Sequence, residues 1–313
     1  MIPTIDKLNS TYELVRDFTH KTPVLQSSSL NGIAGCQLYF KCENFQKMGA
    51  FKMRGAIAAI NEISPEQKEA GVVTHSSGNF GQAVALAARN LGVKAYIVMP
   101  KNAPEVKKMA VKGYGGIVTE CESTLDARES SSAQIVAETG ASFLHPSNDL
   151  NVILGNATAG IELLEEVPDL NFLVAPVGGG GLLAGTALAA HYFGAKCKVI
   201  GGEPFEADDA YRSLKSGRIE QNETANTIAD GLRTHLGHIN FPIIQQLVTE
   251  IIRVEEDEII AALRLIWERM KIIVEPSCAV PFAAVLREKA SFKNQKVGII
   301  LSGGNVDVNN LPF

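Results

Sequence analysis

Apolar and polar positions follow two patterns along the chain, and together they predict helices interleaved with strands. Apolar residues spaced three or four positions apart indicate amphipathic helices, and short apolar runs bounded by Gly or Pro indicate buried strands. Helices are predicted over residues 5–18, 80–91, 104–113, 125–138, 155–166, 182–192, 259–270 and 281–288, and from Lys52 to just before Ser64. Strands are predicted over residues 37–43, 71–75, 94–99, 116–120, 142–145, 172–177, 197–202 and 297–301, with an extended segment over 22–25.

This alternation of strands and helices predicts an α/β protein with parallel sheets wrapped by helices. It occurs in two series, which predicts two lobes. A small mobile domain would span residues 71–148, and a large cofactor-binding domain would combine residues 1–70 and 149–313. Ligands bind beyond the carboxyl ends of the strands in such sheets. Three unusual loops lie at strand ends in this prediction, so we expect a site in the cleft between the lobes: residues 76–81, 178–181 and 302–305.

Composition narrows the class of protein. The chain has 313 residues, of which 46% are hydrophobic and 20% charged, as is typical of soluble globular proteins. The net charge is -5 and no basic patch with interleaved aromatic residues occurs, which argues against a nucleic-acid partner. The apolar runs are too short to span a bilayer, and the N-terminus lacks the apolar core of a signal peptide. Five cysteines without a C-x-x-C pair argue against a disulfide framework or zinc site and favour a cytoplasmic location.

Lys52 is the first candidate for chemistry, because it lies at a junction between a loop and a helix. The positive end of the helix dipole, the cationic Arg54 and partial burial would all favour the neutral amine. A neutral lysine can attack a carbonyl and form a Schiff base. The alternative is an ordinary surface lysine, and this segment alone does not decide between the two.

The run Gly178 to Gly181 lies between a predicted strand and a predicted helix. Such a backbone can approach a ligand closely, and the helix dipole behind it favours an anion. The dinucleotide pattern G-x-G-x-x-G and the nucleotide pattern ending in G-K-[ST] do not fit. A tight turn with positive φ is the alternative, but one glycine would suffice for it. We therefore expect a phosphate that belongs to neither a dinucleotide nor a nucleoside triphosphate.

Two further loops could bind polar groups of a ligand. The hydroxyls and free N–H groups at residues 76–79 suit a carboxylate, although Ser76 or Ser77 could simply cap a helix. Ser302 could bond a ligand heteroatom, although it could equally form a turn. One cofactor has an aldehyde for the amine, a phosphate for the glycine run and a ring nitrogen: pyridoxal 5'-phosphate.

Together, these residues and the segments around them make the chain resemble the fold-type II pyridoxal-phosphate enzymes. Within that family, the chain is most similar to the serine racemase and serine-threonine dehydratase (ammonia-lyase) branch. The resemblance implies the two-lobed fold of the tryptophan synthase β type. It spans nearly the whole chain, and its segments occur in the same order: KTPVL (21–25), KCENFQKMGAFKMRGA (41–56), THSSGNFGQA (74–83), PVGGGGLLAG (176–185), GEPFEADD (202–209), IADGLRT (228–234), WERMKIIVEPS (267–277) and LSGGNVD (301–307).

The resemblance implies roles for the cofactor-binding residues. Lys52 would hold the cofactor covalently with Phe51 beside it, and Asn79 would bond its 3'-hydroxyl. Gly178, Gly179, Gly180 and Gly181 would bind the phosphate. Ser302 would face the pyridine nitrogen, and its neutral hydroxyl would leave that nitrogen largely unprotonated, which in this family suits β-elimination.

The resemblance also implies a substrate site and a metal site. Ser76, Ser77 and Gly78 would hold the substrate carboxylate, and Ser77 would lie opposite Lys52 as the second acid or base of racemases. A divalent cation, Mg²⁺, Ca²⁺ or Mn²⁺, would bind oxygen ligands from Glu203, Asp209 and the carbonyl of Ala207. We also expect a homodimer that acts on a small amino acid.

The implied activity is dehydration of a β-hydroxy amino acid, such as L-serine or L-threonine, to a 2-keto acid and ammonia, with serine racemisation as a second outcome. Serine racemase as the main activity, 3-hydroxyaspartate dehydratase and a non-catalytic cofactor carrier are alternatives. Arg128 could meet the second carboxylate of 3-hydroxyaspartate. The chain departs from the family pattern at Met48, Ala50, Phe80 and Ser147, which affects the expected pocket, and we match no motif for a nucleotide effector.

Overall fold

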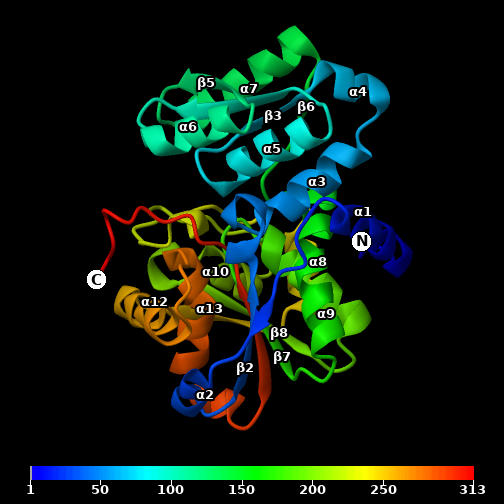
Figure 1. Cartoon of the computed structure of the whole chain (residues 1–313). Coiled ribbons are helices and arrows are strands. Elements are labelled where there is room, and N and C mark those ends of the chain that lie inside the picture. Colours follow the sequence, from blue (N-terminus) through cyan, green and yellow to red (C-terminus); the bar gives the residue numbers. More distant parts are fainter. Residues whose placement is uncertain (1) are drawn as a thin grey trace.

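The computed structural model describes residues 2–313 and contains two β-sheets, which lie one above the other in Figure 1. The larger sheet comprises, in spatial order, β1 (Val24–Leu25), β2 (Gln37–Cys42), β10 (Lys296–Leu301), β7 (Phe172–Pro176), β8 (Lys198–Pro204) and β9 (Glu250–Val254). The smaller sheet comprises β5 (Ile117–Cys121), β4 (Ala95–Pro100), β3 (Val72–His75) and β6 (Ser142–Phe143). Strand β1 runs antiparallel to β2, and the other neighbouring strands are parallel.

Helices cover both sheets. They are α1 (Ile5–Arg16), α2 (Ser28–Ala34), α3 (Lys52–Glu62), α4 (Pro65–Ala70), α5 (Asn79–Asn90), α6 (Glu105–Gly113), α7 (Leu125–Thr139), α8 (Leu150–Glu166), α9 (Gly181–Phe193), α10 (Asp209–Ser216), α11 (Phe241–Leu247), α12 (Glu256–Met270), α13 (Pro276–Arg287) and α14 (Lys289–Phe292). Short 3₁₀ turns are η1 (Glu43–Phe45), η2 (Lys47–Gly49), η3 (Phe205–Ala207) and η4 (Asp230–Leu232). No helix within residues 2–313 is long and apolar enough to cross a membrane.

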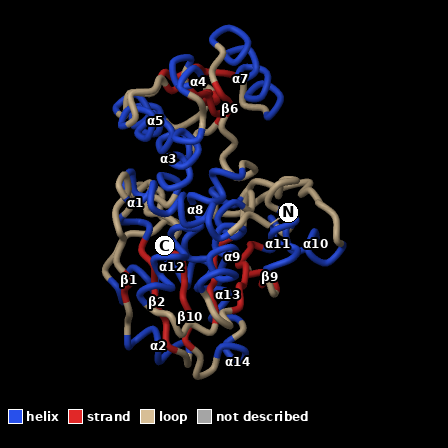
Figure 2. The backbone as a smooth tube through the Cα atoms, turned by 90° about the vertical axis from the view of Figure 1, so that its right-hand side faces the viewer, coloured by secondary structure: helices blue, strands red, loops and turns tan. Residues whose placement is uncertain are grey.

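The first predicted series of strands forms the smaller sheet, and the second series forms the larger sheet together with β1, β2 and β9. Helix α3 lies at the junction of the two bodies, and α8 lies directly beneath it in the larger body (Figure 2). Met53 of α3 and Val152 of α8 pack into the core of the smaller body, whereas Ile153 of α8 packs into that of the larger one. Because these helices contribute to both bodies, the domain boundaries after residues 70 and 148 stay a prediction.

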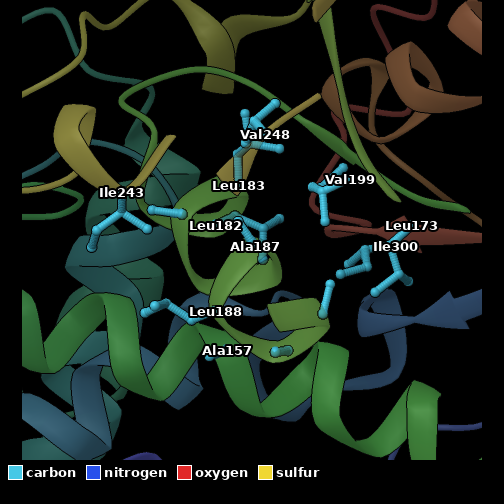
Figure 3. Packing of buried hydrophobic residues seen from close by; sticks show 14 of the residues in the cluster. Ala157, Leu173, Leu182, Leu183, Ala187, Leu188, Val199, Ile243, Val248 and Ile300 are labelled. Atoms are coloured by element: carbon cyan, nitrogen blue, oxygen red, sulfur yellow. The ribbon is translucent and has the colours of Figure 1, made fainter. Parts of the chain in front are cut away.

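Helix α9 is buried along its length, and this fixes the glycine run that precedes it. Leu183 and Ala187 pack near Leu173, Val199 and Ile300 of the larger sheet (Figure 3). A side chain at Gly185 would meet the backbone of α8, with its Cβ atom 2.7 Å from the nitrogen of Ala157. A helix held so closely on both sides gives the loop at its N-terminus a rigid base.

Most predicted elements are confirmed to within a few residues, but two predicted helix starts are wrong. Helix α8 begins at Leu150, where the Asp149 side chain accepts bonds from the backbone of Asn151 and Val152, and not at residue 155. Helix α13 begins at Pro276, so Pro281 lies inside the helix instead of opening it. The patterns did not predict α2, α4, α10, α11, α14 or β9.

Candidate active site

Lys52 begins helix α3, as the sequence predicted, and its amine points into the protein. The Nζ atom donates a hydrogen bond of 2.7 Å to the carbonyl oxygen of Pro146. It also lies 4.9 Å from the ring centre of Phe51 and 5.5 Å from that of Phe80. The surface-lysine alternative does not fit this environment.

Burial lowers the pKa of Lys52 to about 8, and the negative charge of Glu275 opposes this shift. The direction agrees with the expectation from the sequence, but the contribution expected from Arg54 was wrong. The Arg54 guanidinium points away into the core, where Glu43 and Glu162 balance its charge. Desolvation is therefore the main reason why a neutral amine is accessible near neutral pH.

Backbone contacts fasten the loop before Lys52 to the end of β10. The N–H of Phe51 donates to the carbonyl of Ser302 at 3.0 Å, and Ala50 forms a β-bridge with Gly303. Ser302 itself is only 3% exposed. The structure thus brings two predicted site segments, far apart in the sequence, to one place.

The loop from Ser76 to Gly78 connects β3 to α5. The Ser76 Oγ atom accepts a bond of 3.3 Å from the N–H of Gly78, so the Ser76 side chain helps to stabilise the turn between β3 and α5. The Ser77 hydroxyl has no hydrogen-bond partner among residues 2–313, and the space beside Gly78 is open. Since Phe80 in the first turn of α5 lies against the Lys52 amine, this loop borders the same site.

Asn79 is held by Glu275, which the sequence did not identify as a site residue, and by Asn305 of the predicted 302–305 loop. The Asn79 Nδ2 atom donates to both carboxylate oxygens of Glu275, and its Oδ1 atom accepts from Asn305. Glu275 is 5% exposed, and burial raises the pKa of its carboxyl group to about 7. Glu275 precedes Pro276 at the start of α13, but its side chain makes no capping bond there, so no local signal in the sequence marked it as a site residue.

The four glycines form a tight loop with unused backbone donors. Within residues 2–313, the N–H groups of residues 178–183 have no hydrogen-bond acceptor. Only Gly180 has a positive φ, of 78°, so the turn alternative does not explain the whole run. A Cβ atom on Gly179 would overlap Ser147, and one on Gly178 would lie 2.9 Å from the carbonyl oxygen of Gly231. Free donors at a helix N-terminus, lined by glycine, fit a phosphate.

Ser147 connects the glycine loop to Lys52. It directly follows Pro146, the acceptor of the Lys52 amine, and it packs against Gly179 and Gly181. Neighbouring His145 accepts bonds from the backbone of Ser147 and Asn148 at its Nδ1 atom. Burial lowers the pKa of His145 to about 4, so this ring is neutral beside the site.

The predicted metal residues are brought together at the end of β8. Glu203 and Asp209 are 0% and 1% exposed, so neither is a surface acid. Burial, together with the charge of Asp209, raises the pKa of Glu203, and burial raises that of Asp209 to about 6. Ala207 is buried in η3 between them in sequence. Each of the four carboxylate oxygens accepts a hydrogen bond within the chain, from the backbone of Ala210, Tyr211 or Leu236 or from the Asn222 side chain. Residues 2–313 hold no cluster of three His, Cys, Asp or Glu side chains, so the cation site stays a prediction.

Comparisons with known proteins agree with this arrangement. Residues 15–303 match the family described as pyridoxal-phosphate dependent enzyme. Serine racemase of Dictyostelium discoideum is 48% identical over 98% of this chain and 96% of its own length. The beta-hydroxyaspartate dehydratase of Paracoccus denitrificans is 43% identical over 100% of this chain and 99% of its own length.

A solved structure of threonine deaminase from T.th. is 41% identical and superposes with a TM-score of 0.93, covering 97% of this chain and 99% of its own. The predicted two-lobed α/β class is thereby confirmed. The chain belongs to the family of pyridoxal-phosphate dependent enzymes and is an enzyme of the lyase or isomerase type.

Proposed function

We propose that this enzyme removes the β-hydroxyl group of a small hydroxy amino acid, L-serine or L-threonine, and yields a 2-keto acid and ammonia. The observation that carries the proposal is the half-buried Lys52, whose amine bonds the Pro146 carbonyl and has a pKa lowered by burial to about 8, near a glycine loop with free N–H donors. Relatives named serine racemase, beta-hydroxyaspartate dehydratase and threonine deaminase support it.

The cofactor-binding residues in this proposal are Phe51, Lys52, Asn79, Gly178 to Gly181 and Ser302. When bound, pyridoxal phosphate supplies an electron-withdrawing ring that makes the α-proton of an amino acid more acidic. The free N–H groups at residues 178–183 would bind its phosphate. Hydrogen bonds to Glu275 and Asn305 already hold the Asn79 side chain in one orientation, which determines how it would approach the cofactor.

The substrate would be held by its carboxylate at Ser76, Ser77 and Gly78, where hydroxyl and N–H donors begin α5. Lys52, whose lowered pKa of about 8 makes its amine easier to deprotonate, would take the α-proton in its neutral form. The β-hydroxyl would then leave as water, and the free N–H groups at residues 178–183 would hold the cofactor phosphate, which when bound would supply an acid–base group for this departure. Hydrolysis of the remaining enamine would give the 2-keto acid and ammonia.

Racemisation is a second outcome that the free hydroxyl of Ser77 favours. If Ser77 returns a proton to the face opposite Lys52 before the β-hydroxyl leaves, the product is the other enantiomer. The serine racemase of Dictyostelium discoideum supports this second outcome.

A dicarboxylic substrate, 3-hydroxyaspartate, is favoured by the position of Arg128. Its Nε atom bonds only the Thr124 carbonyl of its own helix, and it forms no ion pair within residues 2–313. Burial lowers the pKa of His75, which directly precedes Ser76, and the charge of Arg128 adds to this lowering. A cation so close to the substrate loop could meet a second carboxylate, and the relative from Paracoccus denitrificans supports it.

We further propose a divalent cation bound by Glu203, Asp209 and the carbonyl of Ala207. Mg²⁺, Ca²⁺ and Mn²⁺ all suit oxygen ligands. A homodimer is a proposal that rests on the resemblance, and light scattering of the purified protein tests it. A cytoplasmic location is a proposal that rests on the five cysteines without a C-x-x-C pair.

Proton NMR in D₂O tests the reaction. The holoenzyme is incubated separately with L-serine, L-threonine and 3-hydroxyaspartate, and recovered serine is analysed on a chiral column. Pyruvate from serine supports the dehydratase, and deuterated D-serine with little pyruvate supports the racemase. Reaction with 3-hydroxyaspartate alone, with a raised KM in Arg128→Ala, supports the dicarboxylic substrate. No reaction with any of the three would exclude these substrates for the enzyme.

A further inference from the structure

Beneath the candidate site lies a cluster of four buried charged residues that takes no part in the proposed chemistry. It comprises two cations and two anions, none more than 2% exposed: Lys41, Glu43, Arg54 and Glu162. Replacing buried ion pairs by apolar residues is often neutral or stabilising, so stability alone is a weak reason for such a cluster. Its position suggests another role.

Arg54 is the centre of the cluster, and each of its three side-chain nitrogens donates at least one hydrogen bond. Its fork meets Glu43, with Nε to Oε2 at 2.7 Å and Nη2 to Oε1 at 2.8 Å. Its two Nη atoms meet the oxygens of Glu162 at 2.8 Å each. Further bonds run from Nη1 to Thr158 Oγ1 and from Nη2 to the carbonyl of His20. A planar guanidinium with this many partners has one orientation.

Lys52 and Arg54 share the first turn of α3 but point to different sides. Residues two positions apart on a helix are separated by about 200° around its axis. Lys52 reaches Pro146 at the site, and Arg54 reaches Glu43 and Glu162 in the core. Fixing the Arg54 side chain therefore fixes the rotation of this turn, and with it the direction of the Lys52 amine.

The groups that hold Arg54 are themselves rigid. Glu162 also accepts a bond of 2.5 Å from Lys41 of β2, and it lies on α8. Helices α3 and α8 cross in close contact, since a Cβ atom on Gly155 would overlap the carbonyl oxygen of Arg54. By contrast, the loop that leads to Lys52 is irregular, with positive φ at Met48 and Gly49. The ion pair between Glu43 and Arg54 joins the two ends of this loop and restricts its movement.

We propose that Arg54 is a positioning residue for Lys52, which sets the rotation of the first turn of α3 and so aims the amine at the cofactor. The inference rests on the proposed function, in which Lys52 carries the cofactor. The proposal predicts that the direction of the Lys52 amine depends on the planar geometry of the Arg54 guanidinium as well as on its charge.

Two variants test it. Arg54→Lys keeps the charge balance but loses the fork, and the double variant Arg54→Met/Glu43→Gln removes one cation and one anion while leaving the Lys41–Glu162 pair. We expect both to fold. Borohydride reduction of the holoenzyme followed by peptide mapping should show cofactor attachment at Lys52 that is about ten-fold slower or more, and kcat should fall similarly with little change in KM.

Lys108→Met is the matched control. Lys108 is 5% exposed and bonds Glu120 at 2.8 Å in the smaller body, away from α3. It should lower the melting temperature without changing the rate of attachment to Lys52. Attachment and kcat at wild-type levels in both Arg54 variants would overturn the inference, as would losses that only follow the folded fraction, as in Lys108→Met. Labelling of a different lysine in the wild-type protein would instead overturn the assignment of Lys52 on which the inference rests.

Discussion

Asn79 donates its side-chain amide to both carboxylate oxygens of Glu275, at 3.0 and 3.1 Å. This pair joins the first turn of α5 to the start of α13, and the N–H of Glu275 continues the link to the carbonyl of Gly303. A buried carboxyl group therefore orients the amide that we expect to contact the cofactor.

Glu275→Gln should change how stability depends on pH. The pKa of Glu275 is raised from 4.5 to about 7, so the folded protein keeps a proton that the unfolded chain has released. Wild-type apoprotein should thus lose stability as pH rises from about 4.5 to 7, by up to about 3 kcal/mol. Glutamine stays neutral, so the variant should lack this part of the slope. Urea unfolding at several pH values measures it, and identical slopes in both proteins would contradict the prediction.

Lys52→Met should alter stability at the other end of the pH range. Burial lowers the pKa of Lys52 from 10.5 to about 8, so between these values the unfolded chain binds a proton that the folded protein does not. Wild-type apoprotein should therefore gain stability as pH rises from about 8 to 10.5, by up to about 3 kcal/mol. Guanidinium unfolding of apoprotein shows whether the gain disappears in Lys52→Met. An equal gain in the variant would show that Lys52 is protonated in the fold.

The sequence identified Lys52 and the glycine run because each is unusual within a short segment, at the end of a strand or the start of a helix. Glu275 could not be found in this way, since its partner Asn79 is far away in the chain. The error about Arg54 has the same origin, because its charge partner Glu162 comes from another helix. In the fold, β9 was missed because its sequence, EIIRV, mixes charged and apolar residues at an edge of the sheet.

Gly179→Ala should weaken cofactor binding by more than ten-fold. Its new methyl group would overlap the hydroxyl of Ser147 and force the loop with the free N–H groups out of place. The phosphate would lose several of these donors, each worth about 1.5–3 kcal/mol when bonded to a charged group. Fluorescence titration of apoprotein with pyridoxal phosphate measures the change. Gly113→Ala, at the open end of α6, is the control and should bind normally; unchanged affinity in Gly179→Ala would exclude the loop as the phosphate site.

Divalent cations should stabilise the apoprotein through Glu203 and Asp209. Without a cation the two buried carboxylates raise the free energy of the fold, as the raised pKa of each indicates. A cation at one hundred times its Kd should add about 2.7 kcal/mol. Calorimetry with and without Mg²⁺, Ca²⁺ or Mn²⁺ tests this. Asp209→Asn should abolish the shift, whereas Asp169→Asn, an exposed residue paired with Lys296, should retain it. A shift that survives in Asp209→Asn would place the cation elsewhere.

Ser77→Ala should separate racemisation from elimination. The Ser77 hydroxyl is free to exchange a proton with substrate, and acid–base groups of this kind contribute about 10²–10⁴-fold to a rate. We expect formation of D-serine from L-serine to fall by about 100-fold or more. Pyruvate formation should change far less, because Lys52 alone takes the α-proton on that path.

Ser76→Ala is the control, because the Ser76 hydroxyl bonds the N–H of Gly78 in the turn. This variant should lower both rates together by weakening carboxylate binding. Chiral chromatography and a coupled pyruvate assay on the same samples give both rates, and D-serine formed at the wild-type rate by Ser77→Ala would show that another group, or water, protonates the second face.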